Sequence, residues 1–143
     1  MKQITTIAIL LGILSVPAFA ATKNPTNAVF INAKDIKWSE VPGFAGVQTS
    51  TIEGNSEKGA HHAYMKFAPG FSAPLHHHSS DHFVTVVAGT LILTIDGQEQ
   101  RLTAGSYFSF KNKQPHATTC AAGAECILFT DVRGKWDVVL EKK

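Results

Sequence analysis

The segment HFVTVVAGTLILTIDGQEQRL, residues 82–102, contains the clearest structural pattern in this chain. Two runs rich in β-branched residues are separated by Ala88-Gly89, and the second run ends at Asp96-Gly97. An Asp-Gly pair between two strand-like runs is a strong local signal for a β-hairpin. The segment therefore predicts three short strands, with a tight turn between the second and the third.

The same pattern of short alternating runs and turns extends outward in both directions, and no stretch has helical periodicity. Further strands are expected at AVFINAK (28–34), VQTSTIEG (47–54), AYMKFAPGF (63–71), SYFSF (106–110), ECILFTDV (125–132) and KWDVVL (135–140). In total this gives about nine or ten strands at a spacing of roughly 8–12 residues, which is typical of an antiparallel sandwich or barrel. The chain is predicted to be all-β.

The first twenty residues have the features of a secretory signal peptide. Lys2 precedes an apolar run, and Ala18-Phe19-Ala20 forms a small-residue cleavage site. A retained N-terminal anchor is the alternative, although the apolar run is short for a membrane span. We expect cleavage after Ala20, export to a bacterial periplasm, and a single domain over residues 21–143.

The charges of the expected mature chain are nearly balanced. Without Lys2, twelve basic and eleven acidic residues remain, and they are scattered singly. Because there is no basic stripe, nucleic acid is not expected as a partner. After signal cleavage we expect no membrane association, and a small molecule is the expected ligand.

Four histidines fall within residues 76–82, in the segment PLHHHSSDH (74–82). Side chains alternate along a strand, so His76 and His78 share one face while His77 points away. His82 opens the next run, which an antiparallel turn can bring back toward this pair, and His116 begins a later strand. A metal site and a solvated histidine-rich turn are both compatible with the cluster taken alone.

The spacing around these histidines resembles two motifs of the cupin superfamily. From Gly70 to Gly89 the sequence follows G-x5-H-x-H-x3-H-x6-G, where the family pattern has Glu in place of the third His. From Gly105 it follows G-x5-K-x-K-x2-H, and this second motif keeps only Gly105 and His116 of the family pattern. The resemblance covers about residues 45–139 and is closest to small single-domain bacterial secreted cupins.

This resemblance implies a jelly-roll barrel, also called a double-stranded β-helix, with a metal held by His76, His78, His82 and His116. It also implies a homodimer. His82 would make the site all-imidazole, so the ion keeps its full +2 charge and favours anionic or enolate-forming ligands. The metal is a divalent transition metal, either Fe, Zn, Ni, Cu or Mn. Asp81 is an alternative carboxylate ligand, but the spacing selects residue 82.

Other residues are candidates for the surroundings of the site. Asp81 is expected to orient a ligand histidine. Alternation places either His61 or His62 inward, and His62, Tyr64 and Phe108 are candidate pocket residues.

Cys120 and Cys126 flank the five-residue stretch AAGAE, as the two ends of a hairpin would. In an exported protein this arrangement favours a disulfide. The alternative is a pair of free thiols, with Cys120 facing the metal from the strand of His116.

The resemblance implies an iron-dependent dioxygenase that acts on a small organic substrate, since three-histidine iron sites occur in cupin dioxygenases for thiols and β-diketones. Two alternatives remain open. One is a cupin that binds a metal or small ligand without turnover, and the other is a metal-dependent isomerase or hydrolase. No Ser/His/Asp or paired-carboxylate arrangement offers a different mechanism.

Overall fold

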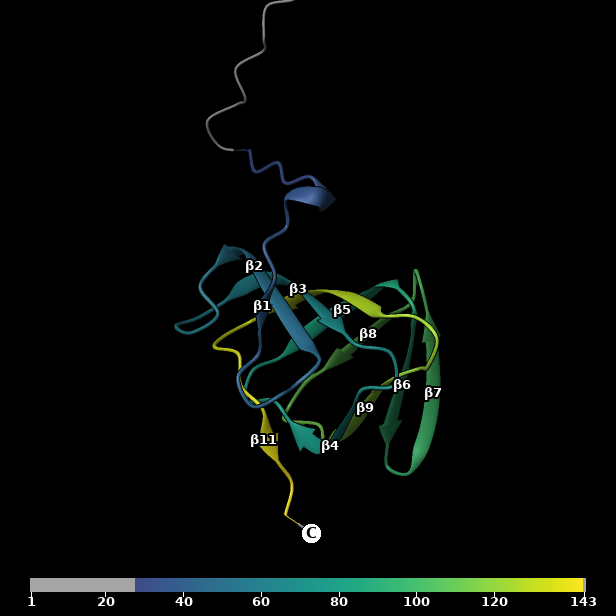
Figure 1. Cartoon of the computed structure of the whole chain (residues 1–143). Helices are drawn as coiled ribbons and strands as arrows, with labels where there is room; N and C mark the ends of the chain where they lie inside the picture. Colours follow the sequence, from purple (N-terminus) through teal and green to yellow (C-terminus); the bar gives the residue numbers. More distant parts are fainter. Residues whose placement is uncertain (1–27, 143) are drawn as a thin grey trace, which may run out of the picture. The chain divides into compact units, whose positions relative to one another are not determined.

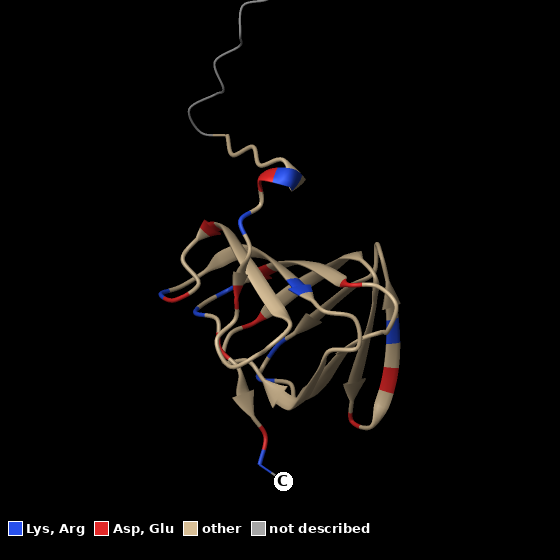
Figure 2. Cartoon of the chain, in the orientation of Figure 1, with Lys and Arg blue, Asp and Glu red and all other residues tan. Residues whose placement is uncertain are grey.

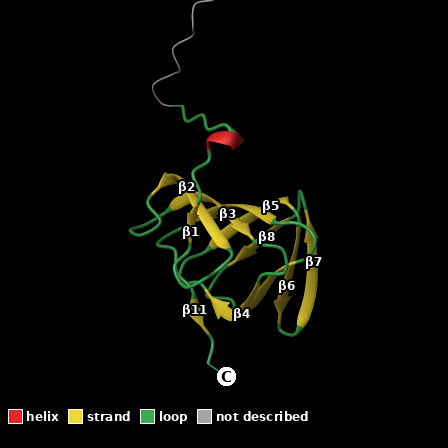
Figure 3. Cartoon of the chain, in the orientation of Figure 1, coloured by secondary structure: helices red, strands yellow, loops and turns green. Residues whose placement is uncertain are grey.

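Short strands make up almost all of the regular structure in the computed structural model, which describes residues 28–142 (Figure 3). The helical structure within this range is a single 3-10 turn, η1 (Ala33–Asp35). Across the described residues there is no helix with the length and apolarity that a membrane crossing needs. The expected signal peptide at residues 1–20 lies outside the described residues.

The strands form two antiparallel sheets (Figure 1). The first contains, in spatial order, β1 (Ser39–Glu40), β2 (Val47–Gly54), β3 (His61–Phe67), β10 (Cys126–Val132), β5 (His82–Ala88) and β8 (Tyr107–Phe110). The second contains β11 (Val139–Leu140), β4 (Ser72–His77), β9 (His116–Cys120), β6 (Thr90–Ile95) and β7 (Gln98–Thr103). The chain passes repeatedly from one sheet to the other, which confirms the expected all-β jelly-roll architecture.

The core lies between the inner faces of the two sheets. Along β3 and β10 every second residue is buried, as expected for strands with one face on the core. Val86 of β5 and Leu91 of β6 are both fully buried, and each side chain of this kind contributes about 1.5–3 kcal/mol on burial. The alternation seen in the sequence is therefore the pattern that closes the barrel.

The Asp96-Gly97 hairpin forms as predicted. Ile95 of β6 pairs with Gln98 of β7, so the turn between the strands contains only Asp96 and Gly97. Both have positive φ, 50° for Asp96 and 76° for Gly97. Two successive residues with positive φ are what a tight turn between twisted strands requires.

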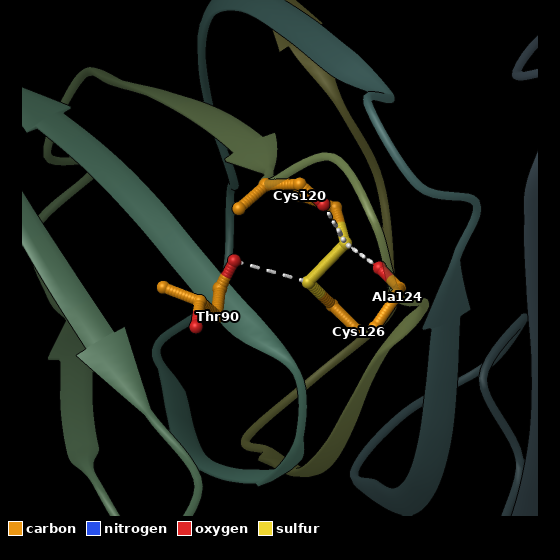
Figure 4. The surroundings of a disulfide bond; sticks show 5 residues. Thr90, Cys120, Ala124 and Cys126 are labelled. Atoms are coloured by element: carbon orange, nitrogen blue, oxygen red, sulfur yellow. Dashed lines mark hydrogen bonds between the residues drawn. A yellow bond between two sulfur atoms is a disulfide. The ribbon is translucent and has the colours of Figure 1, made fainter.

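A disulfide joins the end of β9 to the start of β10 (Figure 4). Cys120 and Cys126 are both fully buried, and the Cys126 sulfur lies 3.2 Å from the carbonyl oxygen of Thr90. The cysteines are thus paired with each other, and neither presents a free thiol to the histidines. The bond closes the turn that connects the two sheets.

Two of the expected strands are wrong or shortened. Residues 28–34 form no strand, because alternation alone does not supply a neighbouring strand to accept the backbone hydrogen bonds. In the segment 135–140, only Val139 and Leu140 pair as a strand, with His77 and His76. The positions of Lys, Arg, Asp and Glu are dispersed along the ribbon of the described residues, and neither sign forms a continuous stripe there (Figure 2).

Candidate metal centre

Four histidines come together where three strands begin or end. His76 on β4 lies directly opposite His116 on β9 in the register of the two strands. His78 follows the end of β4, and His82 is the first residue of β5. All four side chains are buried, with relative exposures of 9% or less.

His76, His78 and His116 each present one ring nitrogen to a common point, and these atoms lie within 4.8 Å of one another. The ring of His82 is stacked on that of His78, with centroids 4.0 Å apart. The ring of Phe110 is stacked on that of His116, with centroids 3.5 Å apart. The three-histidine group could hold a metal ion, and His82 lies beside it.

Backbone carbonyl groups fix the orientation of three of these rings. The Nδ1 atom of His76 lies 2.7 Å from the Pro74 oxygen, and that of His116 lies 2.9 Å from the Gln114 oxygen. The Nδ1 atom of His78 lies 2.5 Å from the Asp137 oxygen. A carbonyl only accepts hydrogen bonds, so each Nδ1 carries the proton and each Nε2 keeps a free lone pair.

A divalent transition metal fits this set of donors. The Nε2 atoms of His82 and His116 are buried and have no hydrogen-bond partner among the described residues. A buried polar atom without a partner costs about 1–3 kcal/mol, and ligation of an ion would remove this cost. Imidazole nitrogen is a good ligand for Fe, Zn, Cu and Ni alike, so the donor set does not choose between them.

The histidines are held in the neutral form that metal binding requires. Burial lowers the pKa of His78 to about 4, and burial also lowers the pKa values of His82 and His116 to about 3. The pKa of His76 is lowered for the same reason. The neighbouring histidines add to the effect, because a second positive charge nearby disfavours protonation. At neutral pH no proton competes with a metal.

The lowered pKa values predict that the metal-free protein loses stability as the pH falls. The unfolded chain has histidines with a pKa near 6.5, so below pH 6.5 it binds more protons than the folded chain. A group shifted as far as His78 costs about 3 kcal/mol of stability by the time the pH reaches 4. Thermal unfolding of the metal-free protein should therefore show a falling midpoint from pH 6.5 downward. The variant His82→Gln should show a shallower fall, and a flat profile between pH 8 and pH 4.5 would contradict the prediction.

The histidines form part of the wall of an apolar pocket inside the barrel. Its empty volume, including the solvent in its mouth, is about 580 Å³. Phenylalanines line it, among them Phe67 of β3 and Phe108 and Phe110 of β8, together with Trp136 from the C-terminal segment. A pocket of this kind is typical of small-molecule sites.

The C-terminal segment, residues 133–141, runs along the histidine-bearing segment, residues 75–81. The Asp137 carboxylate accepts a hydrogen bond of 2.8 Å from the backbone N–H of Ser79, while its carbonyl orients His78. The backbone N–H of Glu141 donates to the Leu75 carbonyl at 3.0 Å. Asp137 has no signal in the sequence, because it acts on His78 through a carbonyl that every residue possesses.

Some of the expected surrounding residues lie elsewhere. Phe108 lines the pocket, but His62 and Tyr64 do not: they lie on the outer face of β3, where His62 contacts Glu53 at 3.2 Å. The prediction that His62 faces inward was wrong, since His61 is the buried member of the pair.

Asp81 was expected to orient a ligand histidine, and this prediction is wrong. Its carboxylate accepts a hydrogen bond from the backbone N–H of Asn112 at 3.3 Å and orients no histidine within residues 28–142. The histidines are oriented by carbonyl groups instead. His77 points outward, as expected, with its Nδ1 atom 2.6 Å from a Glu141 carboxylate oxygen.

Comparison with known proteins agrees with this architecture. The family model for the cupin domain matches residues 63–132. No curated protein matches the chain. Among solved structures, the polyketide cyclase RemF from Streptomyces resistomycificus is 17% identical with a TM-score of 0.68, over 80% of this chain and 85% of that one.

Two further structures share the fold. An RmlC-like cupin from Shewanella frigidimarina is 22% identical with a TM-score of 0.58, over 73% of this chain and 89% of that one. An oxalate oxidase in complex with glycolate is 17% identical with a TM-score of 0.57, over 73% of this chain and 59% of that one. Together with the jelly-roll topology and the family match, these similarities show that the chain belongs to the cupin superfamily.

Proposed function

We propose that this cupin binds one divalent transition metal ion through His76, His78, His82 and His116 and acts as an iron-dependent dioxygenase on a small organic substrate. The observation that carries the proposal is the buried group of His76, His78 and His116, whose ligand atoms lie within 4.8 Å of one another at the wall of an apolar pocket, with the unpartnered Nε2 atom of His82 beside them. Iron, when bound, supplies the chemistry with oxygen that protein side chains lack.

The residues of the pocket favour an oxidative reaction over isomerisation or hydrolysis. The side chains of residues 28–142 that line it include no Asp, Glu, Lys, Arg, Tyr or Cys. An isomerase or hydrolase that relies on a side-chain general acid or base needs such a group beside its substrate. Among the described residues of the pocket, the four imidazoles are the only titratable groups, and all four would be ligands of the metal. One structurally similar protein is itself an oxidase, which is consistent with the proposal.

The chain's own residues have three tasks in this function. The carbonyl groups of Pro74, Gln114 and Asp137 hold the Nδ1 protons, so that the Nε2 atoms remain available. Phe110 fixes the plane of the His116 ring by stacking on it. The remaining apolar wall excludes water from the substrate, which strengthens electrostatic interactions at the histidines.

Metal analysis followed by oxygen-uptake assays tests the proposal. The purified protein should contain about one ion per chain, since the site is mononuclear. After loading with Fe²⁺ under nitrogen, it should consume oxygen with a diketone, a thiol or a phenolic substrate. A bound ion without oxygen uptake on any of the three would refute the dioxygenase and leave a cupin that only binds its metal or ligand. Export, the single domain from residue 21 and the homodimer stay predictions.

A further inference from the structure

Within residues 28–142, no Asp, Glu, Lys or Arg side chain lines the pocket. Twenty residues line it, and four of these are the histidines of the metal centre. The other sixteen are apolar side chains, with the exception of Thr118 and Thr130. A ligand inside this pocket therefore meets one polar end, at the histidines, and an apolar wall elsewhere.

The charged side chains of Lys111, Arg133 and Asp137 do not line the pocket. Phe83 follows the inward His82 on β5 and so faces outward. The Lys111 ammonium and the Arg133 guanidinium each lie 5.2 Å from the centre of the Phe83 ring. The Asp137 carboxylate is engaged by the backbone of Ser79. A second charge on a ligand would find no counter-charge in the wall, and burying an unpaired charge is strongly unfavourable.

The two threonines differ in their availability to a ligand. The Thr130 hydroxyl donates a hydrogen bond of 3.1 Å to the carbonyl of Ala63. Thr118 lies two residues after His116 on β9, and its side chain faces the same pocket. Thr118 is only 8% exposed, and its hydroxyl makes no hydrogen bond within residues 28–142 like the one from Thr130 to Ala63. Thr118 is thus the one uncommitted hydroxyl of the wall.

We propose, building on the metal site of the proposed function, that the ligand is a small molecule with one anionic, bidentate metal-binding group, an apolar body and no second charge. The metal-binding group lies at the histidines and the body lies against the phenylalanines of the wall. The Thr118 hydroxyl supplies a hydrogen bond to the ligand beside its metal-binding group. Thr118 therefore determines specificity, and dicarboxylates and zwitterions are excluded.

Three hydroxamates test this proposal, because they share one metal-binding group and differ only in the body. The full mature protein is loaded with Co²⁺, and the visible spectrum of the ion reports binding of acetohydroxamate, benzohydroxamate and para-carboxybenzohydroxamate. Benzohydroxamate should bind about tenfold or more tightly than acetohydroxamate, because its ring buries apolar area. The para-carboxylate should cost at least about tenfold relative to benzohydroxamate.

The variants Thr118→Val and Thr118→Ser test the hydroxyl. Thr118→Val should weaken benzohydroxamate about three- to tenfold, and Thr118→Ser should restore it. Thr119→Val is the matched control, because Thr119 faces outward from the same strand and contacts Ser72 at 2.9 Å. Equal affinity for benzohydroxamate and its para-carboxylate would overturn this proposal but leave the metal site standing. The same holds if Thr118→Val left the affinity of the Co²⁺-loaded protein for benzohydroxamate unchanged. A protein that binds no Co²⁺ would overturn the metal site, and this proposal with it.

Discussion

We expect the double substitution His76→Ala with His78→Ala to abolish metal binding. Both residues belong to the group whose ligand atoms lie within 4.8 Å, and their removal leaves two of the four imidazoles. If about 10–16 kcal/mol of metal affinity is shared among four ligands, the loss of two costs roughly 6 kcal/mol, or about 10⁴-fold in affinity. Metal content per chain, measured by inductively coupled plasma mass spectrometry after dialysis, should fall from about one to near zero.

His77→Ala is the matched control for this experiment. His77 lies between the two ligands in the sequence but on the opposite face of β4, where it contacts Glu141. This variant should keep its metal, and circular dichroism should show the same β spectrum for both variants. If the double variant retained as much metal as the parent, the ion would be held elsewhere and our assignment of the site would be wrong.

We expect the substitution Gly89→Ala to destabilise the barrel more than the same substitution at Gly70 or Gly105, the other glycines of the two motifs. Gly89 joins β5 of one sheet to β6 of the other and has a φ of +78°. An added Cβ would lie 2.4 Å from the Glu125 carbonyl oxygen and 2.9 Å from the Cys126 Cα. These are backbone atoms that cannot rotate away, and the left-handed conformation adds its own strain. We expect a loss of at least about 3 kcal/mol in the free energy of unfolding, measured with urea on the metal-free protein.

Gly70→Ala separates the two causes of this loss. Gly70 has nearly the same φ, +76°, but an added Cβ would have no atom within 4 Å. Only the strain of the left-handed conformation remains, about 1 kcal/mol. If Gly89→Ala lowered the free energy of unfolding no more than Gly70→Ala, the close approach of the Glu125 and Cys126 backbone would not be the reason for a glycine at residue 89.

The strands were predictable from the sequence where the alternation of buried and exposed residues was strong. The segment 82–102 folds as expected, with β5, β6 and the Asp96-Gly97 turn in place. Residues 28–34 show the same alternation without forming a strand, because a strand also needs a neighbour that accepts its hydrogen bonds. Alternation predicted that every second residue of β3 is buried but not which set of residues faces inward. His62 was therefore expected in the position that His61 occupies.

The sequence by itself determined the all-β class and placed His76 and His78 on one face of a strand, since the two-residue period of a strand is a local property of the chain. Tertiary structure decided that His116, forty residues later, lies opposite His76 in the register of β4 and β9. It also decided that the carbonyl of Asp137 orients His78 and that no Asp, Glu, Lys or Arg of the described residues lines the pocket. Every residue has a carbonyl group, so the sequence does not mark the one that orients His78. The pocket wall is assembled from strands that are distant in the sequence. No local pattern carries either kind of information.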